Sequence, residues 1–228
     1  MIRAQIRPMI RPMIRRMIGG IGGDEGYVDP VPGWAFDYRL NGNDTNLTPI
    51  NSPTIVTGIE LPDKLASEFN GVGQYYTSSD LALTGVGTGA FSIVARFRTT
   101  SSISKVLIST GNGADATTFR LRITGTGFVQ MRINGNLVSV SGGLNDGDWH
   151  QVICTYSGSG GDARLYIDGA LETSATSPVY NLSGTGALQV ASQGGAALFD
   201  GDMDGIRFYD LIVLTPAEVI LLNNNVGV

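Results

Sequence analysis

Cysteine and histidine are almost absent from this 228-residue chain, which has one residue of each. A lone Cys154 excludes a disulfide framework, a zinc knuckle and a CxxC redox pair. It lies in the run WHQVICTY, where we expect a small, packed apolar side chain. His150 lies in the same run without a Ser/Asp context that would make it a general base, so we expect a structural role for it. The lack of disulfides does not indicate a cellular compartment, because neither a cytosolic protein nor an assembled particle needs them.

The N-terminus lacks a long apolar run. Residues 1–23 read MIRAQIRPMIRPMIRRMIGGIGG, in which arginine recurs at short intervals. This leaves no apolar region of the about 7–15 residues that a secretory signal needs. Nor does it approach the ~20 apolar residues of a membrane span. We therefore expect neither a signal peptide nor membrane contact.

The same segment is a repeat of isoleucine and arginine with a period of four. Pro8 and Pro12 oppose a helix, which predicts an extended arm that ends in a flexible glycine joint. A docking arm for a larger assembly is favoured, because a solvated leader has no use for regularly spaced isoleucines. Nucleic-acid contact and a solvated leader stay open as alternatives, although the arm has no aromatic residue for stacking on bases. The residues predicted to dock are Ile2, Arg3, Ile6, Arg7, Ile10, Arg11, Ile14, Arg15, Arg16 and Ile18.

Charge divides the chain into two parts, an arm (1–23) and a domain (24–228). The arm has five arginines and no acidic residue, whereas the domain has ten basic and twenty acidic residues. An acidic domain argues against broad contact with nucleic acid or an anionic membrane. Nucleic acid is therefore not an expected partner of the domain.

Glycine is abundant, with 32 residues, about twice the usual share of ~7%. Spread between short apolar runs, it predicts many tight turns and an all-β protein. Period-two alternation runs through FSIVARFR (91–98), FRLRI (119–123) and FVQMRI (128–133). In FRLRI, Arg120 and Arg122 face away from the apolar side. Turn residues predict hairpins at Asn134-Gly135 and at SGSGGD (157–162). The pattern predicts a two-sheet antiparallel sandwich.

One helix is expected near the C-terminus. Thr215 can cap it, Pro216 suits its first position, and Glu218 completes a capping box before an apolar run. We expect this helix to cover one edge of the sandwich.

Four segments in order resemble the laminin G-like jelly roll of the concanavalin A-like lectin/glucanase superfamily. They are SEFNGVGQYY (67–76), GAFSIVARFRT (89–99), LNDGDWHQVICTYSGSGGDARLYIDG (144–169) and FDGDMDGIRFYDLIVLTPAEV (199–219). The resemblance implies an all-β jelly-roll sandwich of two antiparallel sheets, here with an extended N-terminal arm and one short C-terminal helix. Members of the family commonly bind carbohydrate or protein, often with calcium, and occur in secreted proteins and on bacteriophage particles. A resemblance of this kind implies fold better than function.

Glycosidases of this superfamily carry their carboxylates as E-x-D-x-E, and none of the five glutamates of this chain lies in that pattern. We therefore expect no enzyme activity and no catalytic residue. By the same resemblance Trp149 is expected in the core. Asp168, in YIDG, is expected to bond its own backbone in a turn, as aspartate often does.

The strongest indication of a metal site in the sequence is the run DGDMDG. Asp200, Asp202 and Asp204 alternate along it, as oxygen ligands of a hard cation can. In the family, the aspartate that matches Asp204 often lies near a calcium ion that also takes oxygens from the segment of Asn70. The sequence therefore predicts a calcium site at Asp200, Asp202, Asp204 and Asn70, with Ca²⁺ as the one cofactor considered.

Two functions remain. The favoured hypothesis is a virion structural or decoration protein of a bacteriophage-like particle, displayed on the virion surface and homo-oligomeric. Its arm would dock into capsid or tail proteins, and its jelly roll would point outward, where it could bind surface glycans. The alternative is a free, secreted or cell-surface carbohydrate-binding module.

Overall fold

Alternation of buried and half-buried residues sets the strands of the sandwich. The computed structural model describes residues 31, 36–38, 40, 47–59, 65–78, 87–110, 119–133, 136–139, 142–158, 160–176 and 187–224, so the arm lies outside the described residues. In β8 (Phe119–Ile123) and β9 (Val129–Ile133), every second side chain is buried, and Leu121 lies opposite Met131. This confirms the predicted alternation and leaves the arginines of β8 on the opposite side.

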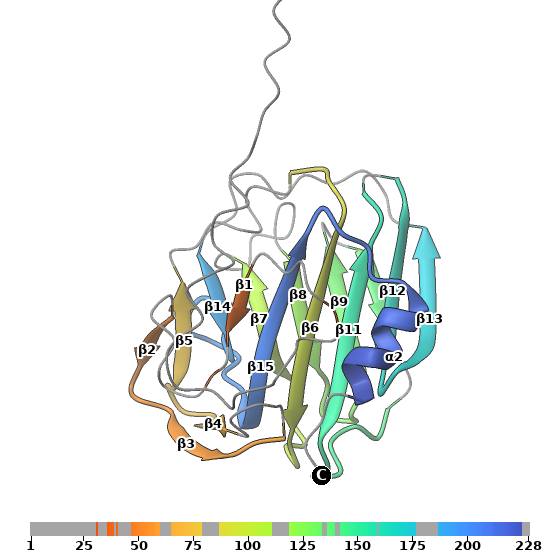
Figure 1. Cartoon of the computed structure of the whole chain (residues 1–228). Helices are drawn as coiled ribbons and strands as arrows, with labels where there is room; N and C mark the ends of the chain where they lie inside the picture. Colours follow the sequence, from red (N-terminus) through yellow and green to blue (C-terminus); the bar gives the residue numbers. More distant parts are fainter. Residues whose placement is uncertain are drawn as a thin grey trace, which may run out of the picture.

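Two antiparallel sheets pack face to face, which confirms the jelly-roll sandwich (Figure 1). The eight-stranded sheet, sheet A, has the order β13-β12-β11-β6-β15-β4-β3, with β1 also paired to β15. Its strands are β1 (Phe36–Tyr38), β3 (Thr54–Thr57), β4 (Leu65–Asn70), β6 (Phe91–Arg98), β11 (His150–Tyr156), β12 (Asp162–Ile167), β13 (Ala170–Thr176) and β15 (Asp200–Asp210).

The seven-stranded sheet, sheet B, has the order β10-β9-β8-β7-β14-β5-β2. Besides β8 and β9 it contains β2 (Thr48–Ile50), β5 (Tyr75–Ser78), β7 (Lys105–Thr110), β10 (Asn136–Ser139) and β14 (Leu188–Val190). Asn136 lies opposite Ile133, which confirms the hairpin predicted between β9 and β10. The hairpin from β11 to β12 is also confirmed, since Ser157 N–H donates to the carbonyl of Asp162.

The main core fills the space between the sheets. Phe91 of β6 belongs to this core, with its ring centroid 5.8 Å from that of Phe119 and 5.6 Å from that of Tyr156. Aromatic pairs at these distances add to the energy of burial. The expected burial of Cys154 is confirmed, and burial raises the pKa of its thiol. Cys154 is thus a packed apolar residue rather than a reactive one.

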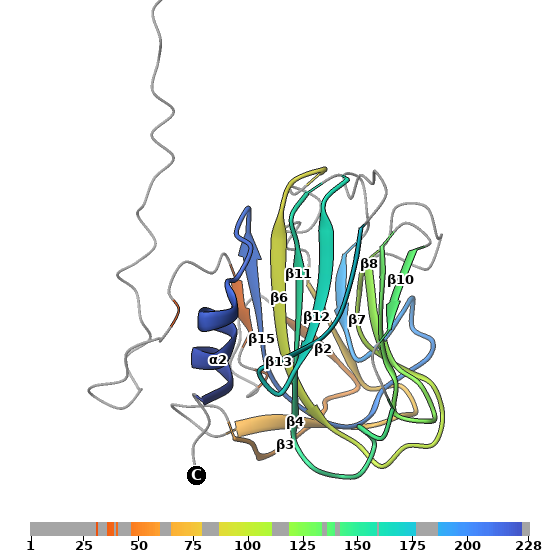
Figure 2. The same ribbon diagram turned by 90° about the vertical axis from the view of Figure 1, so that its right-hand side faces the viewer.

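A second core lies on the outer face of sheet A, beneath α2 (Pro216–Asn224). Val219 and Leu222 of the helix pack there with residues of four strands, namely Val94, Ile153, Tyr166 and Tyr209. Figure 2 shows α2 lying against this face. The prediction that the helix covers an edge of the sandwich is therefore wrong: it covers a sheet face. For the same reason β6 is buried on both faces, so its alternating residues do not divide into buried and exposed.

The start of α2 is capped as predicted. The Thr215 N–H and hydroxyl donate to the Glu218 carboxylate at 2.7 and 2.8 Å, and the Glu218 N–H donates to the Thr215 hydroxyl at 3.3 Å. Pro216 is the first helical residue. This box fixes the point at which the chain leaves β15 and turns over sheet A.

Candidate functional site

The outer face of sheet A is closed to ligands at its centre. Arg96, which is 1% exposed, donates to the Leu222 carbonyl of α2 at 2.5 Å, and Gln151 donates to the same carbonyl at 3.2 Å. These bonds provide donors for a backbone carbonyl in the last turn of the helix, and they hold the helix on the sheet. The part of this face beneath α2 is therefore not available to a ligand.

Sheet B presents a row of polar side chains on its outer face. Directly opposite one another on adjacent strands lie Arg132, Arg120, Ser109, Gln189, Thr77 and Thr48. Their neighbours along the strands, such as Leu121 and Val190, belong to the main core, which places the row on the other face. With strands ~4.8 Å apart, the row from Arg132 to Thr77 is about 19 Å long. That is longer than a single sugar ring.

A turn between β14 and β15 lies over the middle of this row. The Ser109 hydroxyl, which is fully buried, donates to the Ser192 carbonyl at 2.7 Å. The Gln189 side-chain oxygen accepts a hydrogen bond from Gly194 N–H at 2.6 Å. The turn thus covers Ser109 and contacts Gln189, and the arginine end of the row lies beside it.

We call Arg120, Arg122 and Arg132 the arginine patch. All three are half-buried, on β8 and β9. Arg120 donates through Nη1 to the side-chain oxygen of Gln193 at 2.9 Å, and Arg122 donates through Nε to that of Gln130 at 2.7 Å. These bonds fix two guanidinium planes beside the turn. Arginine and glutamine are residues that bind hydroxyl and oxyanion groups through planar arrays of hydrogen bonds.

Sequence reasoning found the outward orientation of Arg120 and Arg122, but not the patch. Arg132 belongs to a separate run, and Gln193 reaches Arg120 from a turn 73 residues further along the chain. The one signal for this patch in the sequence was the recurrence of arginine on the polar side of two consecutive predicted strands.

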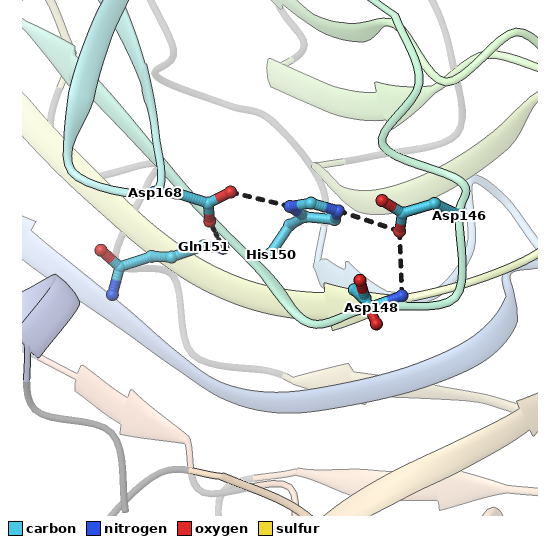
Figure 3. A network of polar contacts seen from close by, with 5 residues as sticks. All are labelled: Asp146, Asp148, His150, Gln151 and Asp168. Carbon is cyan, nitrogen blue, oxygen red and sulfur yellow. Dashed lines mark hydrogen bonds and ion pairs between the residues drawn. The ribbon is translucent and has the colours of Figure 1, made fainter. Parts of the chain in front are cut away.

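His150 forms a second polar cluster at the start of β11 (Figure 3). Its Nδ1 lies 2.8 Å from the Asp168 carboxylate and its Nε2 lies 3.1 Å from that of Asp146. The hydrogen bond to Asp168 and the one to Asp146 raise the pKa of His150 against the opposing effect of burial. A hydrogen bond from the Asp148 N–H, and then the one from His150, lower the pKa of Asp146. With both ring nitrogens bonded to carboxylates, His150 is held as a structural tie, in keeping with the role expected for it.

Asp168 differs from its prediction. It does lie in the turn between β12 and β13, with a φ of 49°. Its carboxylate accepts hydrogen bonds from His150 and, at 2.7 Å, from the Gln151 N–H, rather than bonding its own turn. The residue therefore ties the turn to β11.

Trp149 is half-buried rather than part of the core. The Arg98 guanidinium lies over its ring, 5.1 Å from the centroid, and Arg98 is itself paired with Asp202. The expectation of a core tryptophan is wrong, because the ring is half-buried and lies against the Arg98 guanidinium.

The residues predicted to bind calcium lie along β15 and at the end of β4. Asp202 pairs with Arg98, Asp204 accepts a hydrogen bond from the Ile59 N–H at 2.6 Å, and Asp200 lies opposite Asn70. Over the described ranges, no three Asp, Glu, His or Cys side chains form a group that could hold a metal ion. The described side chains thus do not fit a shared site for the four residues, and calcium binding stays a prediction.

Family membership follows from residues 70–220, which match the model described as the concanavalin A-like lectin/glucanases superfamily. The match covers more than half of the chain. The chain belongs to this superfamily. A comparison with curated proteins found no match.

Solved structures with a fold similar to that of this chain include carbohydrate-binding modules. The CBM40 of the Ruminococcus gnavus IT-sialidase, bound to α2,3 sialyllactose, has a TM-score of 0.56 and 20% identity over 75% of this chain and 98% of its own. Domain 4 of AbnA, an extracellular arabinanase from Geobacillus stearothermophilus, in complex with arabinotriose, has a TM-score of 0.64 and 15% identity over 84% and 98%. The binding domain of Paraclostridial Mosquitocidal Protein 1 has a TM-score of 0.63 and 16% identity over 84% and 52%. At these identities the likeness concerns the fold, which this chain shares with carbohydrate-binding modules.

The described helix is too short to cross a membrane. The predicted arm, residues 1–23, lies outside the described residues, as does its proposed contact with other proteins.

Proposed function

We propose that this protein is a non-enzymatic carbohydrate-binding module that holds glycans on the outer face of sheet B. The observation that carries the proposal is the polar row on this face, with Arg132 and Arg120 on one side of the turn that covers Ser109, and Thr77 on the other. Its side chains offer many donors and acceptors on a rigid sheet, as a ligand rich in hydroxyl groups requires. The cover that α2 forms over the centre of the outer face of sheet A and the fold shared with carbohydrate-binding modules support the proposal.

Binding without catalysis is supported by the state of His150. A general base needs a ring nitrogen that can take a proton from the reacting group. Both nitrogens of His150 are instead bonded to carboxylates.

The test is a glycan array probed with the full-length protein, followed by calorimetric titration of the glycans that bind. We expect binding to a restricted set of oligosaccharides. A protein that is folded by circular dichroism and binds no glycan at about millimolar concentration contradicts the proposal.

We further propose that the arm attaches the module to a larger assembly, in the arrangement of a bacteriophage surface protein. The support is the sequence itself: five arginines and regularly spaced isoleucines combine charge with apolar area, and the prolines keep the segment from folding alone. Such a segment orders on a partner, here capsid or tail proteins.

A further inference from the structure

Charge is separated between the two sheets of the sandwich. The seven strands of sheet B contain no aspartate or glutamate and four basic residues, Lys105, Arg120, Arg122 and Arg132. The strands of sheet A contain eight acidic residues and four arginines. The domain as a whole is acidic, so a sheet with basic strands and no acid is set apart from its surroundings.

The positions of the arginines add a second observation. Arg120 lies directly opposite Arg132 on the neighbouring strand. Arg122 lies two residues from Arg120 along β8, on the same face and ~7 Å away. Three guanidinium groups thus lie within the reach of one small ligand.

The bonding of Arg122 leaves donors for such a ligand. Within the described part of the chain, its one polar contact is the Nε bond to Gln130. That bond fixes the plane of the group and leaves the two terminal NH2 groups. These terminal groups form the planar fork that binds an oxyanion with two parallel hydrogen bonds.

We propose that the arginine patch binds the anionic group of an acidic oligosaccharide, a carboxylate or a sulfate ester, with Arg122 as the principal contact. This proposal rests on the proposed function and names the class of glycan that the site selects. An oxyanion accepts from these guanidinium groups hydrogen bonds in which both partners are charged. A sugar hydroxyl accepts from the same groups without a negative charge of its own.

The experiment compares three ligands on one scaffold: lactose, sialyllactose and lactose sulfate, titrated calorimetrically into the full-length protein. We expect one or both acidic ligands to bind about tenfold or more tightly than lactose, the change that one charge-assisted hydrogen bond provides. The two acidic ligands together distinguish a carboxylate site from a sulfate site. We also expect the preference to shrink between low and high salt, because screening weakens ion pairs.

The matched variants are Arg122→Gln and Arg164→Gln. Both remove one positive charge, but Arg164 lies on sheet A, where it pairs with Asp162. Arg122→Gln should remove the preference for the acidic ligand, and Arg164→Gln should keep it. Equal effects of the two variants would place the acidic ligand elsewhere and overturn the proposal.

The ligand comparison also separates the two proposals. Equal binding of lactose and both acidic ligands by the unmodified protein overturns the charge preference and leaves carbohydrate binding intact. A restricted neutral glycan found on the array, with no acidic one bound, does the same. Absence of binding to every glycan on the array removes the proposed function, and the inference with it.

Discussion

The substitution Leu222→Ala tests whether α2 is a structural cover of sheet A. Leu222 is fully buried in the second core, next to residues of β6, β11 and β12. Its backbone carbonyl, which accepts the hydrogen bonds of Arg96 and Gln151, is kept by the substitution. The variant therefore removes side-chain packing and leaves the polar anchor of the helix in place.

The expected loss follows from burial. A fully buried leucine side chain contributes about 1.5–3 kcal/mol, and the cavity left by Leu→Ala brings the usual cost to about 2–5 kcal/mol. A helix at the surface can settle into part of the cavity, so we expect about 3 kcal/mol of lost unfolding free energy. In a domain of this size, 1 kcal/mol shifts Tm by about 2–4 °C. The Tm should fall by about 6–12 °C.

Thermal unfolding followed by circular dichroism measures this shift, and Leu221→Ala is the matched control. Leu221 is the next residue of the same helix and is 48% exposed, so its substitution should change the free energy of unfolding by no more than about 0.5 kcal/mol. Equal effects of the two substitutions would show that α2 does not pack on sheet A as described. The argument that assigns the ligand to sheet B would then lose one of its supports.

Three further predictions concern the other parts of the chain. His150→Gln should lower Tm more at about pH 6 than at about pH 9. The pKa of His150 is raised in the folded state, so its charged form stabilises the protein fully below the unfolded pKa of ~6.5, and this contribution is lost as pH rises through the folded pKa. An equal loss of Tm at both pH values would mean that the charged form contributes nothing. If calcium binds at Asp200–Asp204, about millimolar calcium should raise the Tm of the unmodified protein and not that of Asp200→Asn, since a ligand stabilises the state that it binds. An unchanged Tm of both proteins would show that calcium does not bind there. Deletion of residues 1–23 should leave a folded domain that keeps its glycan binding and no longer copurifies with capsid or tail proteins; copurification after the deletion would assign the attachment to the jelly roll.

Local signals in the sequence predicted much of the fold. Alternation in FRLRI and VQMRI gave β8 and β9 with their correct faces, and Thr215 with Glu218 gave the start of α2. Each of these features depends on residues a few positions apart, where spacing alone fixes which side chains share a face.

Features that depend on distant segments were not predicted. The row on sheet B requires the pairing of β7 with β14 and of β14 with β5, which join parts of the chain far apart in sequence. The burial of Arg96 depends on α2, whose Leu222 accepts its hydrogen bond from 126 residues away. Alternation within a strand separates two faces, but it does not say that a helix will cover the polar one.

The most direct test of the central claim is a map of the glycan-binding surface by NMR, with an isotope-labelled full-length protein titrated with a glycan that the array identifies. We predict that the backbone amide shifts concentrate on β8, β9 and the turn at residues 191–199, around Arg120, Arg122 and Arg132. Residues of α2 and β13 should stay unchanged and serve as the internal control. Shifts concentrated on sheet A or on the cluster of His150 and Asp168, with none on β8 and β9, would contradict the account.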